Sequence, residues 1–117
     1  MDYMLLIYEP PGQRETRTEA EGRELYDSMV RYAETLKSRG VLRGVQSLKT
    51  DADGVRVRMR DGKRSLMDGP FAEAKEMVGG FFIVDVPTRE DAIEIASRMP
   101  AAQWATVEVR EFGPCFT

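Results

Sequence analysis

A short tract in the second half of the chain combines an acid, a glycine-proline corner and an aromatic ring, in the order Asp68-Gly69-Pro70-Phe71. Proline disfavours helical backbone in the residue before it and glycine permits a bend, so this order predicts a corner that leaves Asp68 at a strand end. Side chains at such ends often face a cavity. We predict that Asp68 is a general acid or base in a cleft; the alternative is a plain turn in which its carboxylate bonds its own backbone.

The residues around this corner are those we expect to contact a ligand. They are Tyr8, Gly69, Pro70, Phe71, Glu73, Lys75 and Glu76. Tyr8 ends an apolar run and can hydrogen-bond into a cleft. Glu73, Lys75 and Glu76 can orient a substrate, or they can form a short charged helical turn at the surface.

Composition excludes several classes of chemistry. The chain has no histidine, which rules out a histidine base, a Ser-His or Cys-His pair and a histidine-ligated metal within one chain. No glycine-rich nucleotide loop or metal cluster is present, so we predict no cofactor and no metal. The net charge of -3 makes nucleic-acid binding unlikely without a local basic patch. No apolar run reaches the roughly 18 residues that span a bilayer, and the single cysteine, Cys115, fits the reducing cytoplasm.

The hydrophobic pattern predicts the elements that position this tract. Two stretches with apolar residues at helical spacing read as helices, and the first can begin at Thr18 with Glu21 or at Thr16 with Glu19. Strands are expected at 3–8, 41–48, 55–60, 63–67, 81–86 and 105–110, and helices between the first two and the last two of these.

This order contains two strand-helix-strand units with a hairpin inserted between them. It predicts an α+β fold of the ferredoxin-like split βαβ type, as one domain over residues 1–117. Helices would cover one sheet face and leave the other apolar and open, so we expect a homodimer.

Alternation along the hairpin places Val55, Val57 and Met59 inward and three arginines outward. With Lys63 and Arg64 beyond the Asp61-Gly62 turn, these arginines form a basic cluster. The cluster is either a docking face for an anionic partner or a solvated face that discourages edge pairing.

The run from Asp68 to Glu76, with Gly79-Gly80-Phe81 after it, resembles the signature of the YCII-related family in its DGPF branch. The opening residues 3–8, Gly40-Val41-Leu42 and Pro100-Ala101-Ala102 match as well. The resemblance implies a dimeric α/β barrel, similar to that of muconolactone isomerases, with a cleft in each protomer. Relatives pair a histidine with an aspartate there. This chain lacks the histidine, which leaves Asp68 to work with Tyr8, Lys75 or another basic side chain.

Three functions remain open from the sequence, of which the third is a dimeric scaffold whose loop at Asp68 to Glu76 only braces the fold. The first is a small dimeric ligand-binding domain with proton-transfer or hydrolytic activity on a small molecule near Asp68. The second is a non-catalytic regulatory or interaction protein linked to sigma-factor-dependent transcription, because family members are often encoded beside alternative sigma factors. Residue types alone do not decide whether the protein is an enzyme.

Overall fold

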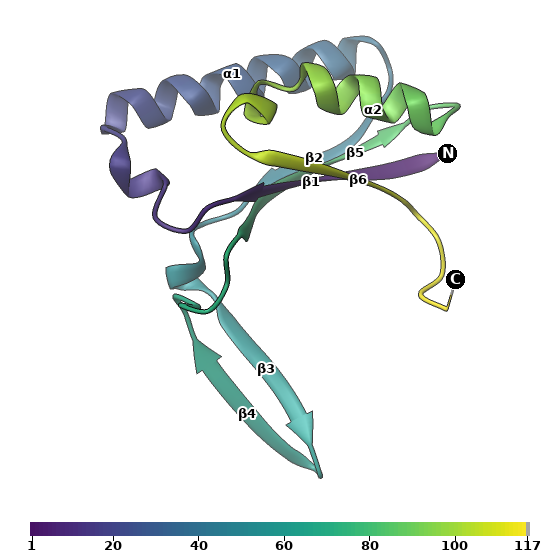
Figure 1. Ribbon diagram of the computed structural model, residues 1–117. Coiled ribbons are helices and arrows are strands. Elements are labelled where there is room, and N and C mark those ends of the chain that lie inside the picture. The colour runs from purple at the N-terminus through teal and green to yellow at the C-terminus, as the bar shows by residue number, and fades with distance from the viewer. Residues whose placement is uncertain (117) are drawn as a thin grey trace.

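The computed structural model describes residues 1–116 and has an antiparallel four-stranded sheet in the order β2-β5-β1-β6. Both helices cover one face of this sheet (Figure 1). The elements are β1 (Asp2–Glu9), α1 (Glu19–Ser38), β2 (Leu42–Ser47), β3 (Val55–Arg60), β4 (Lys63–Asp68), β5 (Met77–Asp85), α2 (Arg89–Arg98) and β6 (Thr106–Glu111), with 3-10 turns η1 (Arg14–Thr16), η2 (Asp51–Asp53) and η3 (Pro100–Gln103). The predicted α+β class and split βαβ order are confirmed.

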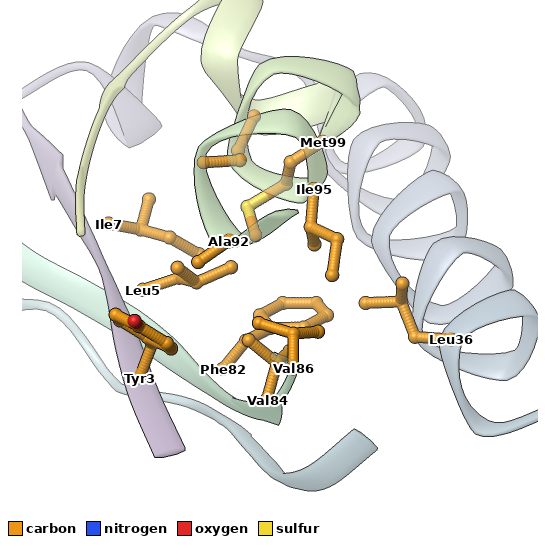
Figure 2. Close-up of a cluster of buried hydrophobic side chains, with 12 residues drawn as sticks. Tyr3, Leu5, Ile7, Leu36, Phe82, Val84, Val86, Ala92, Ile95 and Met99 are labelled. Atoms are coloured by element: carbon orange, nitrogen blue, oxygen red, sulfur yellow. The ribbon is translucent and has the colours of Figure 1, made fainter. Parts of the chain in front are cut away.

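The core lies between the sheet and the helices. Along β1 the residues alternate between buried and half-buried, as a strand with one covered face requires. Figure 2 shows Phe82 of β5 close to Ile95 of α2 and Leu36 of α1, and all three are almost fully buried. Tyr32 of α1 also packs against Phe82, with ring centroids 6.3 Å apart, and its hydroxyl donates to the Ile95 carbonyl of α2. The two helices are thus held to each other as well as to the sheet.

Local signals at the ends of α1 act as expected. The Thr18 hydroxyl accepts from the Glu21 amide while the Glu21 carboxylate accepts from the Thr18 amide, so the helix starts with a capping box. Gly40 follows the helix with a φ of 75°, a conformation that glycine adopts without strain. Neither this helix nor α2, the two α-helices of residues 1–116, is long and apolar enough to cross a membrane.

The β3–β4 hairpin is a separate two-stranded sheet that projects away from the helices (Figure 1). Its turn residues Asp61 and Gly62 have φ values of 51° and 74°, which gives the tight turn predicted for this pair. The inward orientation expected for its apolar residues is wrong for the single chain. Val55, Val57 and Met59 are 52%, 58% and 56% exposed, because the strands pair only with each other and no other element covers them.

Candidate functional site

A cavity of about 620 Å³ lies between α1 and the sheet. Its helix side includes Leu25, Met29 and Val30, and its sheet side includes Val45 and Phe82. These side chains give it apolar walls. Charged residues gather at one end, where β1 ends, η1 crosses and α1 begins. A mostly apolar hollow with a few polar groups at one end is the usual form of a small-molecule site.

Glu9 is the only buried charged residue within residues 1–116 and lines this cavity. It continues the inward face of β1, two residues after Ile7, and is 6% exposed. Arg14 of η1 donates from Nε to Oε1 of Glu9 at 2.5 Å. The same guanidinium donates to the carbonyls of Leu48, at 2.8 Å, and Gly79, at 3.3 Å. Arg14 therefore compensates the buried carboxylate and joins β1 to the ends of β2 and β5.

The chain makes room for this carboxylate at Gly79. Pairing between β1 and β5 shifts here, because Ile7 pairs with Gly80 and Tyr8 with Val78, which leaves Gly79 as the extra residue of a bulge. A Cβ on Gly79 would lie 2.3 Å from Oε2 of Glu9. No group of residues 1–116 donates a hydrogen bond to Oε2. Glu9 thus has one oxygen paired with Arg14, while the other packs against Gly79 and accepts no hydrogen bond from these residues.

A second cation lines the same end of the cavity. The guanidinium of Arg17 lies over the Trp104 ring, 6.0 Å from its centroid, and both residues are half-buried. Gln13 donates from its side chain to the Trp104 carbonyl at 2.9 Å, which ties η3 to the loop before η1. The cavity end therefore combines a carboxylate, two guanidinium groups and an indole.

The structure does not place Asp68 in a cleft. Asp68 is the last residue of β4, is exposed, and borders neither this cavity nor the second one described below. Asp68 pairs with Val55 at the base of the hairpin, where both residues are exposed. Phe71, expected as its wall, instead has the Arg56 guanidinium over its ring, 4.0 Å from the centroid. The acid-base role of Asp68 remains a prediction without the expected surroundings in the single chain.

Three of the residues predicted to contact a ligand lie together at a second cavity. Tyr8, Phe71 and Glu76 line a second cavity of about 540 Å³ at the base of the hairpin. Gly69, Pro70, Glu73 and Lys75 line neither cavity. Residues 71–76 contain one turn, closed by a hydrogen bond from the Ala74 amide to the Phe71 carbonyl at 3.0 Å, and no helix.

Packing explains the glycine and the bend of the predicted tract. A Cβ on Gly69 would lie 1.8 Å from the backbone oxygen of Asp51, so only glycine fits against η2. The Asp51 carboxylate accepts from the Phe71 amide at 3.3 Å, while Asp68 accepts no hydrogen bond from residues 1–116. The carboxylate that braces this loop is thus Asp51.

Sequence reasoning missed Glu9, Arg14 and Arg17. The strand predicted over 3–8 ends before Glu9, although alternation through Tyr3, Leu5 and Ile7 places Glu9 on the buried face. A charged residue at an inward position was the available signal. Nothing comparable marks Arg14 or Arg17, whose roles depend on contacts with distant residues.

The arrangement is suited to binding a small molecule and moving a proton. A carboxylate with a free oxygen can take a proton from a bound molecule or return one, provided that the proton lies within hydrogen-bond reach. No group of three or more Asp, Glu or Cys side chains within residues 1–116 is placed to hold a metal ion.

Comparison with known proteins bears on the fold and the family. The solved structure of 5-chloro-2-hydroxyhydroquinone dehydrochlorinase (TftG) from Burkholderia phenoliruptrix AC1100, in complex with 2,5-dihydroxybenzoquinone, is similar with a TM-score of 0.57 and 16% identity. The match covers 97% of this chain and 94% of that chain. At this identity the likeness shows a common fold and no more.

A curated protein from Rhizobium meliloti (strain 1021), named uncharacterized protein R00369, is 33% identical over 67 residues. The alignment covers 57% of this chain and 54% of the relative, so it spans about half of that protein. The YCII-related domain matches residues 1–114. The match takes in both helices, all six strands and every residue of the Glu9 cavity. The chain belongs to the YCII-related family.

Proposed function

We propose that the protein binds a small organic molecule in the cavity between α1 and the sheet and transfers a proton to or from it through Glu9. The observation that carries the proposal is the free Oε2 of a buried carboxylate at the polar end of a cavity of about 620 Å³. Arg14 holds the carboxylate through Oε1, and the missing side chain of Gly79 at the bulge leaves the room that Oε2 occupies. The apolar walls would hold the body of the molecule.

Binding is tested with 2,5-dihydroxybenzoquinone, the ligand named for the dehydrochlorinase of similar fold. The chain has one tryptophan, Trp104, and it lines the cavity, so its fluorescence reports occupancy. Proton transfer is tested by following the ring hydrogens of the quinone by proton NMR in D₂O. In each exchange a C–H bond breaks and a C–D bond forms, with Glu9 carrying the proton to solvent. We expect quenching with saturation, and exchange faster than in buffer.

The decisive variant is Glu9→Gln, which keeps size and removes the proton acceptor. We expect exchange to fall to the buffer rate. Glu19→Gln is the matched control, because Glu19 also lines the cavity but is exposed and paired with Arg23 at 3.2 Å. Equal exchange by wild type and Glu9→Gln would refute the role of Glu9. Asp68→Asn is measured alongside, and loss of exchange in that variant would return the acid-base role to Asp68.

We also propose that the protein is a homodimer, with the barrel formed by two sheets. Met4, Leu6, Phe81 and Ile83 lie on the sheet face away from the helices and stay partly exposed. On the hairpin, Val57 and Leu66 face each other across the strands, and Leu66 is 55% exposed. An isolated two-stranded hairpin is marginal in water. Covering both surfaces with a second copy would remove this apolar area from solvent.

The dimensions of the chain also support the proposed homodimer. Its radius of gyration is 16.1 Å, whereas a compact domain of this length has about 13 Å. The excess comes from the hairpin, which projects away from the sheet and the helices (Figure 1).

Light scattering after size exclusion tests this directly, with an expected mass of twice 13.3 kDa. Leu66→Lys should shift the protein to the monomer, because it places a charge on the apolar side of the hairpin. Ser65→Lys, next to it on the opposite side, is the control and should leave the dimer intact. A monomeric wild type at high concentration would refute the proposal.

Three narrower expectations rest on the resemblance and composition alone. Membership of the DGPF branch, the link to sigma-factor-dependent transcription and a cytoplasmic location remain predictions. The exposed arginines of β3 are compatible with a regulatory partner, and binding of an acidic partner to the hairpin would support that alternative.

A further inference from the structure

At the polar end of the cavity, the carboxylates have ion-pair partners among residues 1–116, whereas Arg17 has none. Glu9 is paired with Arg14, and Glu19, which is exposed and also lines the cavity, is paired with Arg23. No carboxylate of residues 1–116 forms an ion pair with Arg17. The charge of Arg17 also acts on the exposed Glu21, whose pKa is lowered mainly by hydrogen bonds with Thr18 and to a smaller extent by Arg17.

Arg17 is also held in position. Its guanidinium lies over the Trp104 ring, and a planar cation on an aromatic face is attracted by the ring and loses mobility. The Trp104 backbone is fixed by Gln13, and the Arg17 amide donates to the Arg14 carbonyl at 3.2 Å. A half-buried arginine without an ion-pair partner at a cavity wall has free donors for a carboxylate or a similar planar anion.

The charges along the rest of the cavity would orient a bound ligand. From Arg17 the walls run along α1 past Leu25 and Met29, which are apolar, to Glu34 at the far end. Thr18, next to Arg17, and Glu34 are 16 residues apart along the chain, or about 24 Å of helix. An anion is therefore favoured at the Arg17 end and disfavoured at the Glu34 end.

We propose that the ligand is an amphipathic small acid, with an anionic head bound by Arg17 beside Trp104 and an apolar body along α1. This inference rests on the proposed use of the cavity and adds the chemical class and orientation of the molecule. Arg17 is the residue that selects the head group. The head would then lie at the end of the cavity that holds Glu9, within the same polar cluster.

The test uses three probes of one shape that differ in charge: 4-phenylbutyrate, 4-phenylbutyramide and 4-phenylbutylamine. Binding is measured by calorimetry and by Trp104 fluorescence on the full-length protein. Hydrogen bonds to a charged partner are worth about 1.5–3 kcal/mol, so we expect the carboxylate to bind about 10-fold to 100-fold more tightly than the amide. The amine should bind most weakly, because it places a cation beside Arg17.

Arg17→Gln should remove the preference for the carboxylate while leaving the affinity for the amide within about threefold, since only the charged contact is lost. Arg17→Lys keeps the charge and should retain part of the preference. Arg31→Gln is the matched control: it changes the net charge equally, but Arg31 is an exposed residue of α1 that does not line the cavity. It should bind all three probes as the wild type does.

Each other outcome counts against the inference in a distinct way. If carboxylate and amide bind equally, or if Arg17→Gln keeps the preference, Arg17 does not select an anion, although the cavity remains a ligand site. If none of the probes binds while the quinone exchange still depends on Glu9, the proposed class of ligand is refuted and the proposed function stands. If both fail, the cavity is not the site.

Discussion

Replacing Gly79 by alanine should disrupt the Glu9 site without touching its charged groups. The added Cβ would lie 2.3 Å from Oε2 and 2.8 Å from Cδ of Glu9, and 3.0 Å from Nη2 of Arg14. Carbon and oxygen atoms that are not bonded pack about 3.5 Å apart, so the carboxylate would have to retreat by about 1 Å. It cannot retreat freely, because Arg14 holds its other oxygen.

The change in the free energy of unfolding caused by Gly79→Ala is the balance of two opposing effects. Forcing an extra methyl group into a packed site costs about 1–3 kcal/mol. Against this, alanine lowers the entropy of the unfolded chain and contributes about 0.4–1 kcal/mol of stability where its backbone conformation is allowed. We expect a net loss of about 1–2 kcal/mol, or a fall in the urea midpoint of about 0.5–1 M if the slope is about 2 kcal/mol/M.

Urea unfolding followed by Trp104 fluorescence measures this loss at fixed protein concentration. The informative comparison is the cycle of Gly79→Ala, Glu9→Ala and the double variant. Once Glu9 is alanine the clash with the carboxylate is gone, so Gly79→Ala should no longer cost stability and should contribute up to about 0.4–1 kcal/mol. Gly22→Ala is the control. Gly22 also lines the cavity, but a Cβ there meets nothing within 4 Å, so helix propensity should stabilise this variant by about 0.5–1 kcal/mol.

Two results would refute this reasoning. If Gly79→Ala costs the same with Glu9 present and absent, the loss does not come from the contact with the carboxylate. If Gly79→Ala is as stabilising as Gly22→Ala, the bulge does not hold Glu9 in the position described. In either case the cavity would not depend on the bulge, and the free oxygen of Glu9 would lose its structural explanation.

Two further substitutions test the rest of the framework. Gly69→Ala should cost about 2–3 kcal/mol, because the Cβ would lie 1.8 Å from the Asp51 backbone oxygen and the chain itself must move; an unchanged urea midpoint would contradict the packing of this loop. Tyr32→Phe should cost about 0.5–1.5 kcal/mol, because the Ile95 carbonyl loses its donor. Burial raises the pKa of Tyr32 above 10.0, so the unfolded chain ionises first and the stabilising effect of the hydroxyl is lost as pH rises through the folded pKa. The difference between wild type and Tyr32→Phe should therefore shrink above pH 10.0, and a constant difference would show that the hydroxyl is not buried as described.

Much of the fold follows from patterns between neighbours in sequence. The capping box of Thr18 and Glu21 starts α1, and Asp61-Gly62 closes the hairpin. Such signals act within one turn of helix or one tight turn, so they can be recognised without knowing the rest of the fold. The element order then leaves few topologies, and the split βαβ arrangement is among them.

The candidate site could not be predicted from patterns between neighbouring residues. Glu9 reads as the start of a loop until strand pairing brings it against Gly79, and Arg14 reaches a carbonyl 65 residues away. Asp68 has the more suggestive sequence surroundings, yet it is exposed at the base of the hairpin. The amino-acid sequence by itself determined the order and ends of the helices and strands. Tertiary structure alone decided which carboxylate is buried beside a cavity, because burial depends on strand register and on contacts between distant segments.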